Sequence, residues 1–273
     1  MDASWGMHGT GQERYPRMVA GKPVLGPNQP MHHHRTKCRI YLNQPLRSGL
    51  EAEIPADQAH YLRHVMRLVA GDPITVFNGL GGEYEATVSG LNKNGGACHL
   101  DCFVDVIREL PVRIHIIQCA NKSEKIETVL QKCTELGAAS FQIANSERSQ
   151  FKLTEQKLAS RLERWQKIII EAAEQSERTA IPTVRWCPSL QKVETIGSAY
   201  TLHPEAATTW GENRAEIVKA NEITLAIGPE GGWSRRDIDT LSGLGLHNLT
   251  FGERIMRTET AGPALLSAIQ AVL

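Results

Sequence analysis

Between residues 38 and 110, short apolar runs alternate with segments rich in Gly and Asn, a pattern typical of β-strands joined by tight turns. One stretch differs, because Leu62, Val65 and Met66 recur at helical spacing and Asp57 lies where it can cap a helix. Strands are expected at residues 39–42, 73–78, 83–89 and 97–106. A region of this size and pattern predicts a small β-barrel with one helix.

After residue 110 the pattern changes to apolar runs of strand length that alternate with longer segments of helical periodicity. Strands are expected at residues 114–119, 141–144, 200–202, 223–227 and 249–251. Helices are expected after a capping box at residues 121–124, from Thr154, from Ser234 paired with Asp237, and over residues 259–273. This alternation predicts an α/β fold with a parallel sheet over residues 111–273, in which ligands bind beyond the carboxyl ends of the strands.

Residues 1–37 are rich in Gly, Pro and His and show no periodicity. They contain too few apolar positions to offset the entropy of ordering, so we expect a disordered extension. They also lack the apolar segment of a signal peptide. Because Met31 directly precedes three histidines and the first expected strand, a misassigned translation start is an alternative interpretation.

Composition narrows the class of protein. Apolar residues make up 41% of the chain and charged residues 22%, as in ordinary globular proteins. No run approaches the roughly 18 apolar residues of a membrane span, so no membrane partner is expected. The six cysteines include no C-x-x-C pair and no zinc-ligand spacing, which predicts a reducing, cytoplasmic location and no metal. Cys98 and Cys102, four residues apart in one expected strand, share a face and could form a pair.

The loop at residues 227–234 reads Ile-Gly-Pro-Glu-Gly-Gly-Trp-Ser and joins an expected buried strand to a capped helix. Its glycines allow a ligand to approach the backbone closely. An ordinary strand-to-helix turn explains them about equally well. The loop matches neither the phosphate-binding G-K-[ST] motif nor G-x-G-x-x-G.

The loop at residues 251–261 also runs from a strand into a helix. Thr258 can cap that helix, and Glu259 suits its positive first turn. Arg254 and Arg257 are not explained in this way, because the helix dipole disfavours a cation at this end. Two arginines here indicate an anionic partner, most simply a phosphate or a carboxylate.

Other arginines offer contacts to phosphate. Arg148 lies in the loop before the long helix, and Arg39, Arg63 and Arg67 lie in the barrel region. For the basic residues after Arg148 a solvated helix face is the favoured interpretation, and Arg63 and Arg67 also suit salt bridges along a helix.

In order along the chain, these segments resemble a known family: the RsmE-type methyltransferases of the SPOUT superfamily, which modify ring nitrogen N3 of a uridine in 16S ribosomal RNA. The resemblance spans residues 38–273, and its short motifs are specific as an ordered set. They are HYLRHVMRL at 60–68, FNG at 77–79, QKCTELG at 131–137, SERS at 146–149, RW at 164–165, EAAEQS at 171–176, GPEGG at 228–232 and RTETA at 257–261. The chain departs from the family at Met256, where Leu is usual, and at Gly262-Pro263.

This resemblance implies a PUA-like β-barrel at residues 38–110 and a SPOUT methyltransferase domain with a deep trefoil knot at residues 111–273, acting as a homodimer. It implies S-adenosylmethionine as cofactor, held by Leu202, Gly228, Pro229, Gly231, Phe251, Gly252, Ile255, Met256 and Arg257. As catalytic residues we expect Arg257 to stabilise the uridine anion and Glu230 or Glu259 to accept its proton. As RNA-binding residues we expect Arg39, Arg63, Arg67 and Arg148.

Two other functions remain open: a SPOUT methyltransferase acting on another rRNA or tRNA position, and a non-catalytic RNA-binding or ribosome-assembly factor. The charge distribution bears on how RNA is bound. Thirty cationic and thirty anionic residues give a net charge of 0, divided as +3 over residues 1–37, −3 over 38–110 and 0 over 111–273. Since no ordered region is a basic clamp, we expect few phosphate contacts and recognition of 16S rRNA within the assembled small subunit.

Overall fold

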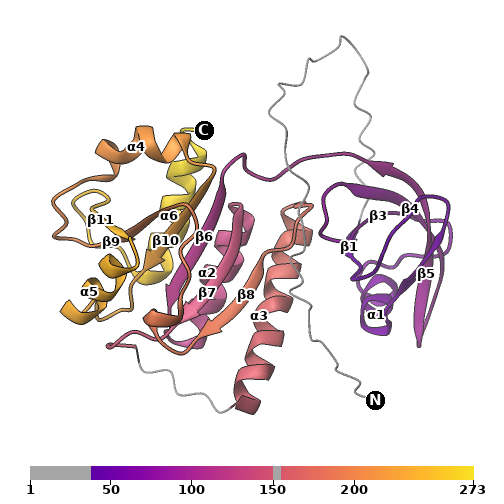
Figure 1. The fold of residues 1–273 in the computed structure, drawn as a ribbon. Coiled ribbons are helices and arrows are strands. Elements are labelled where there is room, and N and C mark those ends of the chain that lie inside the picture. Colours follow the sequence, from indigo (N-terminus) through magenta and orange to yellow (C-terminus); the bar gives the residue numbers. More distant parts are fainter. Residues whose placement is uncertain (1–37, 150–154) are drawn as a thin grey trace, which may run out of the picture. The chain divides into compact units, whose positions relative to one another are not determined.

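A computed structural model describes residues 38–149 and 155–273 of the chain (Figure 1). The expected disorder of residues 1–37 and the expected helix start at Thr154 lie outside the described residues. Within them the strands form one sheet of five strands and one of six.

The five-stranded sheet curls around its own apolar core, and alternate residues of its strands face inward. In β3, for example, Ile74 and Val76 are fully buried. The strand order is β1-β3-β4-β5-β2, and every pair is antiparallel except β1 with β3. The elements are β1 (Arg39–Tyr41), β2 (Glu51–Ile54), α1 (Ala56–His64), β3 (Pro73–Phe77), β4 (Glu83–Asn92) and β5 (Gly95–Val104). The predicted small barrel with one helix is confirmed as this curled sheet, with α1 packed against β4 and β5.

Two local predictions in this sheet are wrong. Helix α1 begins after Pro55 as N-cap, and Asp57 lies inside its first turn. Cys98 is buried whereas Cys102 is exposed, and both are free thiols. A register shift between Glu85 and Ala86 inserts one extra residue into β5, so the two cysteines do not share a face.

The six-stranded sheet is parallel throughout, as the alternation of strands and helices predicts. Its strand order is β11-β9-β10-β6-β7-β8. The strands are β6 (Arg113–Cys119), β7 (Ala138–Ala144), β8 (Thr183–Cys187), β9 (Ser198–Leu202), β10 (Glu222–Ile227) and β11 (His247–Leu249). The helices are α2 (Ser123–Glu135), α3 (Glu155–Gln175), the 3-10 helix η1 (Leu190–Lys192), α4 (Trp210–Lys219), α5 (Arg235–Gly243) and α6 (Thr258–Gln270).

Helices cover both faces of this sheet, so its central strands are buried on both sides. In β6, Ile114 and Ile116 belong to the core that includes Leu130 of α2 and Leu266 of α6. Ile117 faces the other way, into a second core with residues of α5 and the loop before it. Figure 1 shows α2 and α6 over one face and α5 over the other. None of the helices in the described ranges is long and apolar enough to cross a membrane.

The predicted helix caps are partly confirmed. Ser234 and Asp237 form the expected reciprocal capping box of α5. Helix α2 instead has Lys122 as N-cap without a side-chain cap, and Ser123 donates a hydrogen bond to Glu127 within the helix.

A buried arginine joins the segment after β5 to the parallel sheet. Arg178 pairs with Glu109 and donates to the carbonyl oxygens of Thr134 at 3.0 Å and Ala138 at 2.7 Å. Glu109 also accepts hydrogen bonds from the amides of Thr179 and Ala180, both at 3.1 Å. Because the Arg178 side chain is only 5% exposed, this carboxylate supplies the counter-charge that its burial requires.

We expect Glu109→Gln to lower the free energy of unfolding by roughly 3 kcal/mol, because it leaves a buried guanidinium without a counter-charge. The matched control is Glu177→Gln, since Glu177 is 49% exposed and lies 3.7 Å from Arg108. That change should cost less than about 1 kcal/mol. Urea unfolding followed by tryptophan fluorescence measures both, and equal losses would contradict the assignment.

Candidate functional site

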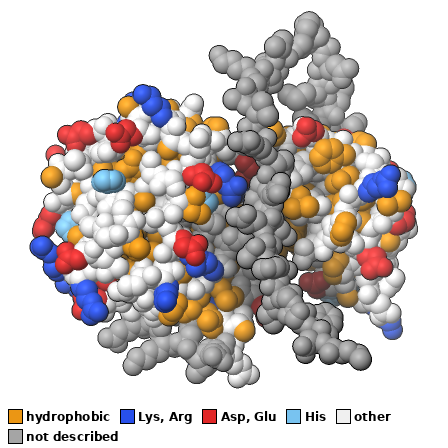
Figure 2. Space-filling model, viewed as in Figure 1, with side chains coloured by type: hydrophobic (Ala, Val, Ile, Leu, Met, Phe, Trp, Pro, Cys, Tyr) orange, Lys and Arg blue, Asp and Glu red, His pale blue; other side chains and the backbone are white. Residues whose placement is uncertain are grey.

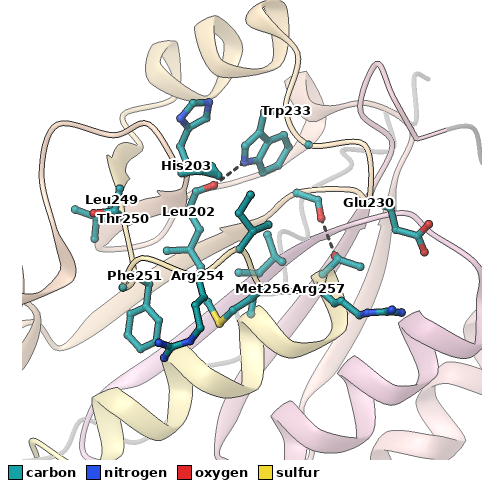
Figure 3. A pocket seen from close by; sticks show the side chains of 18 of the residues that line it. Leu202, His203, Glu230, Trp233, Leu249, Thr250, Phe251, Arg254, Met256 and Arg257 are labelled. Atoms are coloured by element: carbon teal, nitrogen blue, oxygen red, sulfur yellow. Dashed lines mark hydrogen bonds between the residues drawn. The ribbon is translucent and has the colours of Figure 1, made fainter.

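Three loops at one edge of the parallel sheet surround a cavity of about 740 Å³ (Figure 3). They follow β9, β10 and β11, which are neighbours in the sheet and run in the same direction. The cavity therefore lies beyond the carboxyl ends of the strands, where open α/β sheets bind ligands. Its volume is in the range of small-molecule sites.

Most of the residues predicted to hold the cofactor line this cavity. Those that do are Leu202, Gly228, Pro229, Phe251, Gly252, Ile255, Met256 and Arg257. Gly231 does not line it, and its carbonyl oxygen instead accepts a hydrogen bond from Arg148 at 2.8 Å. The sequence argument missed His203, Trp233 and Lys125, which also line the cavity.

Trp233 explains why the loop after β10 needs a glycine. Its indole nitrogen donates to the carbonyl oxygen of Leu202 at 3.0 Å, which ties the loop after β10 to the end of β9 (Figure 3). A Cβ on Gly228 would lie 3.1 Å from the indole ring. The sequence shows a tryptophan directly after Gly231-Gly232. No sequence pattern, however, indicates that its indole bonds to the end of a different strand.

Thr258 has a different role from the predicted helix cap. The N-cap of α6 is Arg257, which makes no side-chain capping bond, and Thr258 is the first helical residue. Its hydroxyl donates to the carbonyl oxygen of Gly228 at 2.7 Å and accepts from the Gln118 amide at 2.9 Å. One buried hydroxyl therefore joins β6, the loop after β10 and the start of α6.

The loop from Phe251 to Met256 presents its backbone to the cavity. Gly252 adopts φ +72°, a conformation that favours glycine. Within the described part of the chain, no amide from 251 to 256 donates a hydrogen bond to another protein group. Leu202, Ile227, Leu249 and Met256 supply apolar walls. Such a site suits a ligand with a flat apolar body and polar edges.

The two loop arginines lie toward different parts of the site. Arg254 extends beside Phe251, whereas Arg257 extends toward the side on which Glu230 lies (Figure 3). Arg254 also lines a smaller adjoining hollow of about 350 Å³ with Trp210 and Phe251, which Arg257 does not reach. The arginines are thus not arranged as a pair around one anion.

Both carboxylates predicted as proton acceptors contact one lysine. Lys125, in the first turn of α2, lies 2.6 Å from an oxygen of Glu230 and 3.1 Å from one of Glu259. The hydrogen bond from Lys125 lowers the pKa of Glu230. The pKa of Glu259 is lowered first by its own backbone amide and then by Lys125. In this arrangement both groups are ionised and are weak bases.

Arg39 is not available to RNA, which corrects the prediction. Its side chain is 10% exposed and pairs with Glu83 at 3.2 Å. Its remaining guanidinium nitrogens donate to the carbonyl oxygens of Ala173 and Arg178, and its Cζ atom lies 3.7 Å from the centre of the Phe77 ring. Burial lowers its pKa. This arginine joins the curled sheet to the segment after α3.

The other predicted RNA contacts remain at the surface. Arg67 and Arg148 are exposed and Arg63 is half-buried, but none of the three lines the cavity. Arg148 lies against the loop after β10 through its bond to the Gly231 carbonyl oxygen. Arg67 follows α1 and holds a positive φ of 56°. Figure 2 shows cationic and anionic side chains interspersed on the face in view, as the neutral charge predicts.

Two models of known families match the chain. One is an RNA methyltransferase domain, matched over residues 108–270. The other is an RNA methyltransferase PUA domain, matched over residues 54–99.

Characterised relatives extend over most of the chain. The ribosomal RNA small subunit methyltransferase E of Synechocystis is 36% identical over 222 residues, covering 79% of this chain and 71% of the relative. The Bacillus subtilis protein of the same name is 32% identical and covers 79% of this chain and 88% of its own.

Solved structures are similar as well. A methyltransferase of Legionella pneumophila in complex with bound S-adenosylmethionine is 34% identical, with a TM-score of 0.80, and covers 87% of this chain and 98% of its own. The ribosomal RNA small subunit methyltransferase E of Neisseria gonorrhoeae, bound to S-adenosylmethionine, is 30% identical, with a TM-score of 0.79, and covers 86% and 97%.

We expect Thr258→Val to lower the free energy of unfolding by about 1–3 kcal/mol, because it removes the hydroxyl that bonds to the Gly228 carbonyl and leaves the Gln118 amide with only its bond to the Cys119 carbonyl. It should also weaken binding of S-adenosylmethionine. Thr260→Val, on the exposed side of the same helix, is the control. Urea unfolding and calorimetric titration measure the two effects, and the assignment fails if both variants behave alike.

Proposed function

Because this chain belongs to the family of ribosomal RNA small subunit methyltransferases E, we propose that it transfers the methyl group of S-adenosylmethionine to ring nitrogen N3 of a uridine in 16S rRNA. The observation that carries the proposal is the cavity at the ends of β9, β10 and β11. Its loops contain the GPEGG and RTETA motifs of residues 228–232 and 257–261.

The residues of the cavity fit the cofactor. The amides of residues 251–256, which bond to no described protein group, are free for the polar edges of an adenine and a ribose. Leu202, Leu249 and Met256 form apolar walls for the flat ring. When bound, S-adenosylmethionine supplies a methyl group activated by its sulfonium charge. The carbonyl oxygen of Gly231 accepts a hydrogen bond from Arg148. In this proposal Gly231 therefore supports the loop and does not contact the cofactor.

The chain's own part in the reaction is to orient the uridine and to remove its N3 proton. A ring nitrogen that carries a proton is a poor nucleophile, so the site must favour the uridine anion. Arg257 is exposed at the start of α6 and supplies a positive charge there. Glu230 lines the same cavity, and Glu259, which does not line it, is joined to Glu230 through Lys125; these two carboxylates are the proposed proton acceptors.

RNA is held by few contacts in this proposal. Arg63 of α1, Arg67 just after it and Arg148 of the loop after β7 contact phosphates, and the target base is unstacked to reach the methyl group. Recognition of the assembled small subunit accounts for affinity that a neutral chain does not supply. The trefoil knot, the homodimer, the cytoplasmic location and the boundary at residue 110 remain predictions from the family resemblance.

The decisive experiment combines purified protein with S-adenosylmethionine and with either small subunits or free 16S rRNA that lack the modification. We expect N3-methyluridine in nucleoside digests analysed by mass spectrometry, with small subunits as the better substrate. Methylation at another position would favour a different RNA methyltransferase. No product, together with no calorimetric binding of S-adenosylmethionine, would favour a non-catalytic RNA-binding factor.

We expect Arg257→Glu to reduce methyl transfer by at least about 100-fold, because it replaces the charge that stabilises the uridine anion with one that opposes it. The fold should be unchanged, since Arg257 makes no capping bond and is exposed. Arg236→Glu, on the exposed surface of α5, is the matched control and should retain activity. Rates are measured with saturating cofactor, and retained activity in Arg257→Glu would refute this role.

A further inference from the structure

Lys125 lies at the rim of the cofactor cavity, in the first turn of α2, and no sequence motif pointed to it. We propose that Lys125 is a positioning residue that holds the carboxylates of Glu230 and Glu259 side by side, so that one of them accepts the N3 proton of the target uridine. The inference rests on the proposed function and assigns to its site a residue outside the loop motifs.

Lys125 contacts both acids at once. Its ammonium nitrogen is 2.6 Å from Glu230, in the loop after β10, and 3.1 Å from Glu259, in the first turn of α6. The two acids thus come from separate elements and meet only at this cation. Without it, two like charges at short range would repel each other and the side chains would separate.

Two other cations each lower the pKa of only one of these acids. Lys122, the N-cap residue of α2, also lowers the pKa of Glu230. The charge of Arg257 lowers the pKa of Glu259. Lys125 is the cation that both acids share among the described residues, and its own pKa is raised by its hydrogen bonds to Glu230 and then Glu259.

The proton balance is simple. The uridine N3–H gives its proton to a carboxylate oxygen, the electron pair of that bond stays on N3, and N3 bonds to the methyl carbon as the carbon–sulfur bond breaks. The sulfur keeps the latter pair and loses its positive charge. Lys125 keeps its protons throughout and acts only through the acids. Removing it should raise the pKa of both acids, so that the proton acceptor becomes protonated, and therefore inactive, at a higher pH.

The test compares Lys125→Met, Lys125→Arg and the control Lys132→Met. Lys132 lies two turns further along α2, outside the cavity, where it pairs with Glu135. Single-turnover rates on small subunits are measured against pH at saturating S-adenosylmethionine. We expect Lys125→Met to be roughly tenfold slower, less than the ~100-fold cost of losing a general base, with its acidic limb moved to higher pH. Lys125→Arg should restore the limb, and Lys132→Met should match the wild type.

A second measurement does not depend on RNA. In protein labelled with ¹³C at the glutamate carboxyl carbons, the signals of Glu230 and Glu259 are assigned with Glu230→Gln and Glu259→Gln. Both should titrate at higher pH in Lys125→Met than in the wild type. Unchanged titration overturns the inference whatever the activity.

The two proposals fail separately. If the wild type does not methylate rRNA, the proposed function falls, and the role of Lys125 in base formation falls with it. If the wild type is active but Lys125→Met shows a slower rate with an unmoved acidic limb, only the role of Lys125 is overturned. Rates of Lys125→Met combined with Glu230→Gln or Glu259→Gln give a further check, because a lysine that acts through an acid gives non-additive losses with at least one of them.

Discussion

The common direction of the six strands in the parallel sheet is the constraint on which the site depends. Because β9, β10 and β11 are neighbours and end at the same edge, three loops distant in sequence meet there. The Thr258 hydroxyl then fixes the start of α6 to the loop after β10 and to Gln118 of β6. The indole of Trp233 bonds the same loop to the end of β9. The cavity is therefore built by buried polar contacts between loops whose positions the sheet has already set.

Several charged side chains pair with other groups inside the protein, so the net charge of 0 does not by itself tell how many cations are available at the surface. Arg39 and Arg178 are buried and donate hydrogen bonds to carboxylates and carbonyl oxygens of the protein. Lys125 is shared by two acids. Fewer cations are therefore available to phosphate than the count of thirty suggests, and Arg67 and Arg148 are among those that are exposed.

Where local pattern carries the information, prediction from sequence is reliable here. The alternation of apolar residues placed most strands of both sheets but missed β2 and β8. The Ser234–Asp237 capping box was recognised because both partners lie within one helical turn. Where a side chain had two possible partners, prediction failed. Thr258 was expected to cap its own helix, yet its hydroxyl bonds to Gly228, thirty residues away. Asn121, the first residue of the predicted capping box of α2, likewise accepts from the amide of Lys122 instead of capping the helix.

The sequence by itself determined the α/β class, the positions of most strands and the two glycine-containing loops that line the cavity, because these depend on periodicity and on the conformational freedom of particular residues. It missed β2, β8 and α4. Only the tertiary structure decided which charges meet. The single extra residue in β5 separated Cys98 from Cys102, burial between elements took Arg39 from the RNA surface, and the packing of α2 beside α6 brought Lys125 to Glu230 and Glu259. Ion pairs between residues far apart in sequence leave no periodic signal, because their energy depends on distance in space and on exposure to water.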